Sequence, residues 1–236
     1  MFLELNHIEI CFYLKSQSMH FPHLFEFLEL LQENNSKDWM DENRKYYHEI
    51  RDSHIAWLEQ MSLKLAEVDK EYTPTTGKKA INRINNNLMF HPNKPVYKDH
   101  FGAGLDQLSK QGDFYLHLGV NETFIAGGYY KPNTDLLSSI RDAIDYNGDE
   151  LQKILNKESF QNTFGGLIKT GNELTNSPKG FSQDHKHIDL LKYKTFAVEK
   201  SLAKSEIFSE HFDEQVISIY QEMLPFRRYL NKAVTV

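Results

Sequence analysis

Cysteine is almost absent from this 236-residue chain, in which Cys11 is the single thiol. A disulfide within the chain is therefore excluded, which fits a reducing compartment, and we expect a cytoplasmic protein. No apolar run reaches the ~20 residues that cross a bilayer, so we expect no membrane partner. The opening stretch MFLELNHIEICFYLKSQS has no basic start and no small-residue cleavage site, so it does not resemble a signal peptide.

An excess of positive charge is also lacking. The chain has 27 Lys and Arg against 33 Asp and Glu, a net charge of −6, which argues against nucleic acid as a partner of the whole surface. The charge is unevenly spread: residues 78–110 hold six basic and two acidic side chains, a net +4, so the remainder carries −10. A basic island therefore lies within an acidic protein.

Motifs that define a reaction are missing as well. The patterns G-x-S-x-G, G-x-x-x-x-G-K-[ST] and H-E-x-x-H do not occur, so we predict no cofactor and no metal, and whether the chain is an enzyme stays open. The run DHKHID offers Asp184, His185, His187 and Asp189, but its spacing matches no established metal site. An N-cap from Asp184 to a short following helix is the favoured interpretation.

Helical spacing of apolar residues predicts helices on both sides of a central region of different period. Ser36 is expected to cap the second helix and Asn133 or Thr134 a later one, while Pro225 should bend or break the last. Residues 73–79 and most of 163–187 are expected to be loop. The expected helices cover residues 20–35, 37–50, 53–68, 134–146, 151–155, 188–193 and 207–234.

In the central region, apolar and polar residues alternate with the period of β-strands. Residues 80–90, 96–104, 113–120 and 123–131 predict three or four antiparallel strands, and residues 194–202 predict one more. We expect residues 94–104 to pair with 113–120, and Asn121-Glu122 to connect the next pair tightly. Gly127-Gly128 indicates a bulge or a close backbone approach. The predicted fold class is α+β, an antiparallel β-meander in the middle of the chain packed by N-terminal and C-terminal helices.

The basic island holds the first group of candidate ligand-binding residues, namely Arg83, Lys94, Tyr97 and Lys98. Ammonium groups beside a tyrosine hydroxyl can hold phosphate or carboxylate. On an extended strand Lys94 and Lys98 would lie ~13 Å apart, which favours a ligand with two anionic groups. The alternative is that the lysines form a solvated sheet edge.

Two further candidates lie on the strand DFYLHLGV. Alternation places Phe114, Leu116 and Leu118 on one face and Tyr115 and His117 on the other. The latter pair either lines a pocket or forms an exposed strand face. The triplet of residues 85–87, all asparagine, predicts a bulge or strand break, because asparagine tolerates left-handed backbone angles.

Several segments occur in a characteristic order along the chain. They are FLELLQENNSKDWM, NKPVYKDHFGA, FYLHLG, FIAGGYYKP, IRDAI, PKGFSQDHKHIDLLKYKTF and the closing helix. This ordered set resembles the family catalogued as domain of unknown function 2461. The resemblance implies a single-domain α+β protein with no assigned reaction. It begins near Met19, so residues 1–18 are interpreted as an N-terminal extension and 19–236 as one domain.

The chain departs from the family's pattern in the basic island. Members of the family that the chain resembles typically have the pattern R-I-x-R-D-x-R-F, followed by S-K-D-K-x-P-Y-K. Matching positions are Arg83, Phe90, Lys94, Tyr97 and Lys98. Neutral residues replace charged ones at Asn86, Asn87, Met89, Pro92 and Asn93. If the family's activity depends on that charged cluster, this member is catalytically altered.

The expected function is binding of a small anionic ligand, phosphorylated or dicarboxylate, through the basic face of the meander. The alternative is a protein-interaction module without catalytic activity, whose partner the sequence does not identify. A pocket shared by basic and aromatic side chains favours the first, and an exposed apolar patch favours the second.

Overall fold

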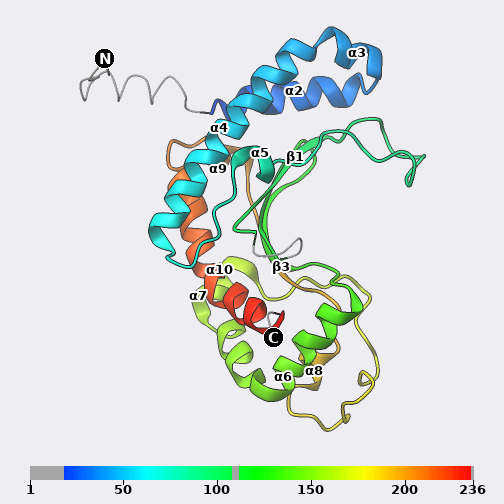
Figure 1. Cartoon of the computed structure of the whole chain (residues 1–236), viewed down its shortest axis with the longest axis vertical. Coiled ribbons are helices and arrows are strands. Elements are labelled where there is room, and N and C mark those ends of the chain that lie inside the picture. The colour runs from blue at the N-terminus through cyan, green and yellow to red at the C-terminus, as the bar shows by residue number, and fades with distance from the viewer. Residues whose placement is uncertain (1–18, 108–111, 235–236) are drawn as a thin grey trace.

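The computed structural model describes residues 19–107 and 112–234, and the predicted extension 1–18 lies outside them. It confirms the α+β class: helices precede and follow a four-stranded antiparallel sheet of order β1-β2-β3-β4 (Figure 1). None of the helices in the described residues is long and apolar enough to cross a membrane.

The helices before the sheet follow the sequence pattern except at one boundary. They are α2 (Phe21–Glu33), α3 (Lys37–Glu42), α4 (Arg44–Val68) and the short α5 (Gly77–Ala80), which lies in the predicted loop. The predicted cap is confirmed, because the Ser36 hydroxyl accepts the Trp39 N–H at 3.2 Å. The predicted break near residue 51 is wrong: the chain breaks at Asn43, whose side-chain amide donates to the Trp39 carbonyl at 2.9 Å.

The sheet confirms the predicted pairing with residues 113–120 only from His100 onward, because β1 does not begin at residue 94. Its strands are β1 (His100–Leu105), β2 (Phe114–Gly119), β3 (Thr123–Tyr129) and β4 (Phe196–Ser201). β1 pairs with β2 and β3 with both β2 and β4. Between β2 and β3 the Gly119 N–H donates to the Glu122 carbonyl at 3.1 Å, which closes the predicted tight connection.

Residues 82–99, which we call the arm, do not form the predicted strand and project from the body beside β1 (Figure 1). Two backbone hydrogen bonds hold its base: Asn86 N–H to the Val96 carbonyl at 3.0 Å, and Lys98 N–H to the Ile84 carbonyl at 2.8 Å. The Asn86 side-chain amide also donates to the Pro95 carbonyl at 2.9 Å. The asparagine triplet thus interrupts the strand pattern and joins the two sides of the arm.

The helices after β3 are α6 (Thr134–Leu155), α7 (Glu158–Phe164), α8 (Ile188–Leu191), α9 (Lys204–Ile207) and α10 (Phe212–Val234). Asn133 caps α6 as predicted, accepting the Leu136 N–H at 2.9 Å. The gap predicted within α6 is only a kink at Asn147. α10 continues through Pro225 without a break. The prediction of an Asp184 cap is wrong, because α8 begins after His187 with no side-chain cap.

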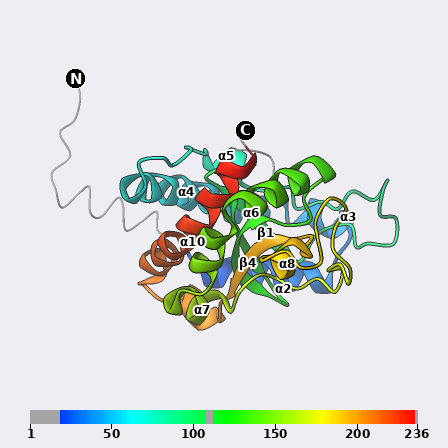
Figure 2. The same ribbon diagram turned by 90° about the horizontal axis from the view of Figure 1, so that it is seen from below.

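The two faces of the sheet differ in what covers them. α10 packs on β3 and α2 on β2, where alternate strand residues such as Phe101, Leu116 and Ile125 are buried (Figures 1 and 2). Gly127 lets α10 approach, because a Cβ there would lie 2.3 Å from the Met223 sulfur. A Cβ at Gly128 would lie 2.3 Å from the Phe196 carbonyl oxygen, so the predicted close backbone approach is confirmed. The opposite face of the sheet is left to form the site.

Candidate functional site

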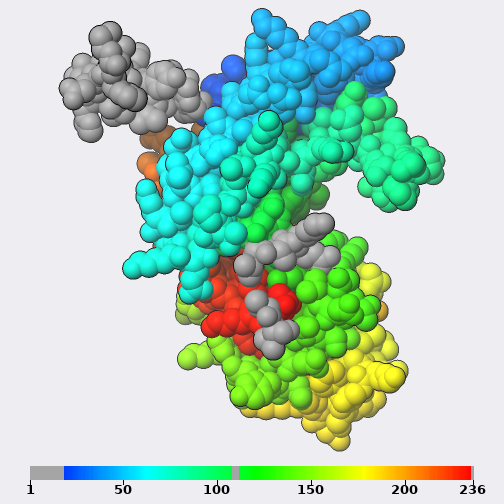
Figure 3. Space-filling view, in the orientation of Figure 1, coloured from blue at the N-terminus to red at the C-terminus, as the bar shows by residue number. Residues whose placement is uncertain are grey.

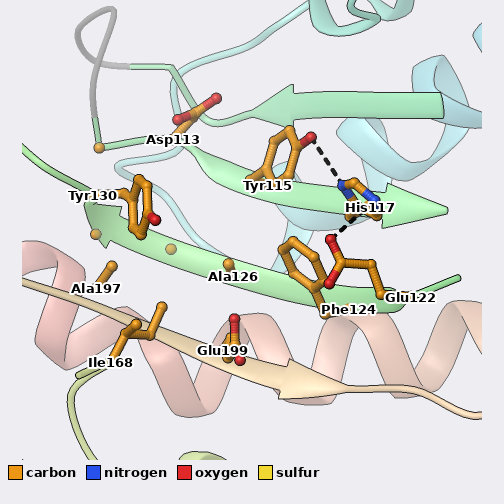
Figure 4. A pocket seen from close by; sticks show the side chains of 13 residues that line it. Asp113, Tyr115, His117, Glu122, Phe124, Ala126, Tyr130, Ile168, Ala197 and Glu199 are labelled. Atoms are coloured by element: carbon orange, nitrogen blue, oxygen red, sulfur yellow. Dashed lines mark hydrogen bonds and ion pairs between the residues drawn. The ribbon is translucent and has the colours of Figure 1, made fainter. Parts of the chain in front are cut away.

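A cavity of about 510 Å³ lies on this second face of the sheet (Figure 4). Tyr115 pairs in register with Gly104 on one side and Ala126 on the other, so small neighbours leave room around its ring. We call this cavity the sheet hollow. It is lined by Gly112, Asp113, Tyr115, His117, Glu122, Phe124, Ala126, Gly127, Gly128, Tyr130, Ile168, Ala197 and Glu199.

His117 is the central polar group of the sheet hollow, and its ring is buried. Phe124 of β3 stacks on it with ring centroids 4.6 Å apart, and His100 of β1 stacks at 4.0 Å. Its Nδ1 lies 3.3 Å from the Tyr115 hydroxyl and its Nε2 lies 3.7 Å from Glu122 Oε1. With the proton on Nε2, the ring accepts from Tyr115 and points its N–H toward Glu122.

Burial keeps the two floor groups uncharged at neutral pH. It lowers the pKa of His117 to about 4, with the neighbouring His100 acting in the same direction. It raises the pKa of the Tyr115 hydroxyl to about 12, and the Asp113 charge adds to that effect. Because charged forms are costly away from water, the floor presents a neutral imidazole and a protonated phenol.

The charge of the sheet hollow comes from three carboxyl groups, on Asp113, Glu122 and Glu199. Among the described residues, no Lys or Arg contributes to the lining. Burial raises the pKa of Asp113, which means that its carboxylate lacks full solvation. The hollow is therefore suited to a positively charged group or to several hydrogen-bond donors.

A second cavity, of about 460 Å³, lies beyond the stacked rings of His100 and His117, and we call it the lysine hollow. Lys94 and Lys98 share it, and burial, followed by the charge of Lys94, lowers the pKa of Lys98. Burial alone would raise the pKa of Asp99, but hydrogen bonds from His100 and Asn121 hold it below its usual value. The lysine hollow is lined by Gln32, Asn35, Asn86, Lys94, Pro95, Tyr97, Lys98, Asp99, His100 and Asn121.

Both hollows lie in the part of the chain that matches a known family. Residues 23–229 match the family described as "Conserved hypothetical protein (DUF2461)". The chain belongs to this family. No curated protein and no solved structure matches it. Two segments that resemble DUF2461, FYLHLG and FIAGGYYKP, form β2 and β3 and supply most of the floor of the sheet hollow. Because the family's description names no reaction, function has to be argued from the geometry.

The six predicted site residues of this DUF2461 member do not converge. Tyr115 and His117 line the sheet hollow, whereas Lys94, Tyr97 and Lys98 line the lysine hollow. The predicted extended strand from Lys94 is absent, because residues 94–99 belong to the arm. Tyr97 is buried in the hydrophobic core. Asn35 also holds its backbone, donating to the Tyr97 carbonyl at 3.0 Å and accepting its N–H at 2.9 Å.

Arg83 lines neither of the two hollows and is exposed. Its backbone carbonyl accepts a hydrogen bond from the Lys98 ammonium, so its main chain restrains Lys98. The DHKHID histidines instead attach a loop to α6: His185 contacts Asp145 at 2.9 Å and His187 contacts Asp149 at 3.4 Å. Within the described ranges, no three His, Cys, Asp or Glu side chains are placed to hold a metal ion.

Sequence reasoning missed Glu122, Phe124 and Glu199. Phe124 could have been identified from the sequence, because its neighbour Ile125 is buried and alternation along β3 places Phe124 on the opposite face. Glu199 follows the buried residues of β4, and only the pairing of Glu199 with Ala126 places it in the sheet hollow, two strands away from Tyr115. That pairing is long-range, and the period of a single strand does not reveal it.

Proposed function

We propose that this protein binds a small organic ammonium compound in the sheet hollow. The observation that carries the proposal is the combination of three carboxyl groups with aromatic rings in one concave lining. Carboxylates attract a cation, and aromatic faces add cation–π attraction when water is excluded. A mostly apolar cavity with a few convergent polar groups is also the usual form of a small-molecule site.

The neutral floor gives the ligand its orientation. Tyr115 and His117 carry no charge at pH 7, so they offer hydrogen bonds without repelling an ammonium group. Glu199 on β4 and Glu122 after β2 lie on opposite sides of Phe124 in Figure 4. A ligand with one amino group and an apolar body would place the amine between carboxylate and aromatic ring.

The test is calorimetric titration with 1,4-diaminobutane, ethanolamine and tetramethylammonium, with uncharged 1,4-butanediol as the ligand control. We expect an amine to bind, and Glu199→Gln to weaken it about tenfold, the scale of one charged hydrogen bond. Glu210→Gln is the matched protein control, because the Glu210 side chain is 89% exposed and lies outside the hollow. Equal binding of butanediol, or equal loss in both variants, would contradict the proposal.

The lysine hollow supports a second candidate, the binding of a small anion with phosphate or carboxylate groups. It is favoured by one observation: Lys94 and Lys98 line the same cavity, where burial first and then the charge of Lys94 lower the pKa of Lys98. An anion placed between the two ammonium groups would relieve that repulsion.

Titration with pyrophosphate and succinate tests the anion site. Lys98→Ala should weaken binding by about 1–3 kcal/mol, less at high salt, whereas Lys45→Ala, at a side chain 93% exposed on α4, should not. If neither anion distinguishes wild type from Lys98→Ala, the lysines are a solvated edge of the arm.

A further inference from the structure

The tip of the arm presents three consecutive apolar side chains to solvent. Leu88, Met89 and Phe90 are 36%, 82% and 69% exposed, and within the described chain none of them packs against the hydrophobic core. Figure 3 shows the arm standing clear of the body. Apolar residues gathered on a projecting segment are typical of a surface that another molecule covers.

The tip is held in place rather than loosely attached. Ile84 and Tyr97, at the base of the arm, are 3% and 5% exposed. At the tip, the Asn87 carbonyl accepts the Phe90 and His91 N–H groups at 3.2 and 3.0 Å. A preformed projection loses less conformational entropy on docking than a flexible loop would.

The sheet hollow complements the arm in charge and in chemistry. The arm carries Arg83, Lys94 and Lys98 against Asp99, which gives 3 − 1 = +2, whereas the lining of the hollow carries three carboxyl groups. A cavity of about 510 Å³ lies within the size range of small-ligand sites, so it can admit one or two apolar side chains. The apolar tip and the basic residues of the arm thus match the aromatic rings and the carboxyl groups of the sheet hollow.

We propose that the arm tip of one copy of this chain docks into the sheet hollow of a second copy. The inference rests on the hollow of the proposed function, and a docked tip and an ammonium ligand would compete for it. One such contact is small, but exchange of arms around a two-fold axis makes the contact twice and closes the assembly as a dimer.

Sedimentation between about 5 and about 500 µM tests self-association over the range of weak interfaces. Wild type should shift from monomer to dimer as concentration rises. Phe90→Ser should raise the dissociation constant about 10- to 100-fold, because it removes a buried aromatic side chain. Leu63→Ser is the matched control, since Leu63 is 61% exposed on α4, and it should leave the constant unchanged.

Charge reversal separates docking in the sheet hollow from contact elsewhere. Lys94→Glu alone and Glu199→Lys alone should each stay monomeric, because each brings like charges together at both contacts. An equimolar mixture should dimerise, since each arm then meets a hollow of opposite charge. Monomeric wild type at about 500 µM, or a mixture that remains monomeric while wild type dimerises, overturns the inference.

The dimerisation experiments and the amine titration that tests the proposed function can fail separately. Amine binding by a strictly monomeric protein would refute only the arm-exchange inference. Rescued dimerisation in a protein that binds none of the amines would refute only the ammonium ligand and would make the hollow a protein-binding site.

Discussion

His54 should make the stability of this protein depend on acid in a way that one substitution removes. The side chain is fully buried on α4, beside the rings of Trp57 and Phe101, and neither ring nitrogen has a hydrogen-bond partner among the described residues. Burial lowers its pKa from 6.5 to about 3. The folded protein therefore holds a neutral imidazole that the unfolded chain protonates below pH 6.5.

The direction of the pH dependence of stability follows from the difference between the folded and unfolded pKa of His54. Because the folded pKa lies below the unfolded one, the contribution of His54 is fully present above pH 6.5 and is lost as the pH falls toward 3. At pH 4.5, two units below the unfolded pKa, the wild type should have lost about 2.7 kcal/mol of unfolding free energy through this group. The His54→Leu variant has no imidazole at this position to protonate, so it should not lose this unfolding free energy.

At pH 8 the two proteins should differ less. Removing two unsatisfied polar atoms gains about 1–3 kcal/mol, and the change of side-chain shape costs up to about 1.5 kcal/mol. His54→Leu should therefore lie between about 0.5 kcal/mol below and about 3 kcal/mol above wild type in unfolding free energy at pH 8, and its advantage should rise by about 2.7 kcal/mol at pH 4.5.

Urea denaturation followed by circular dichroism at pH 8, 6.5, 5.5 and 4.5 measures the gap. The difference between the proteins is the useful quantity, since other titrating groups contribute equally to both. A gap that changes by less than about 0.5 kcal/mol across this range would show that the ring is hydrated or partnered in solution, and the reasoning would fail.

Two further substitutions test the packing around the site. Asp106→Asn should lower the unfolding free energy by about 3–5 kcal/mol, because the Arg227 guanidinium, which is 1% exposed, loses the charged carboxylate that lies 2.6 Å from it. A loss below about 1 kcal/mol, measured by urea denaturation, would contradict this. Gly148→Ala should cost about 1–3 kcal/mol, since its Cβ would lie 2.4 Å from the His187 ring. Adding His187→Ala should recover part of that loss, and additive losses in thermal unfolding would argue against the clash.

Much of the architecture could be predicted because it depends on local chemistry. The hydroxyl of Ser36 and the amide of Asn133 cap the helices that follow them, and the alternation around Leu116 places Tyr115 on the opposite face from the core. Each of these features involves residues close in sequence. Local patterns of this kind are the part of a fold that a single sequence expresses directly.

The site was only half predictable, because its members come from distant segments. Tyr115 and His117 were identified from one strand, but the carboxyl group of Glu199 arrives on a strand from the last third of the chain. The basic candidates Arg83, Lys94 and Lys98 do not reach the sheet hollow, and the reason is physical. Residues 80–90 have the apolar spacing of a strand, yet Asn86 and the turn at Asn87 divert the chain into the arm before it can pair along β1.

The arm also changes how the departures from the family's pattern are interpreted. The neutral replacements at Asn86, Asn87 and Met89 all lie on the arm, whereas FYLHLG and FIAGGYYKP retain the resemblance and form the floor of the sheet hollow. The neutral positions therefore lie outside the lining of the sheet hollow, on the segment that we propose to dock. A charged tip would be costly to bury in the hollow of another copy, while Met89 and Phe90 would be stabilised there. Under the arm-exchange proposal, these replacements serve docking of the arm, whereas the alternative interpretation is an altered catalytic cluster.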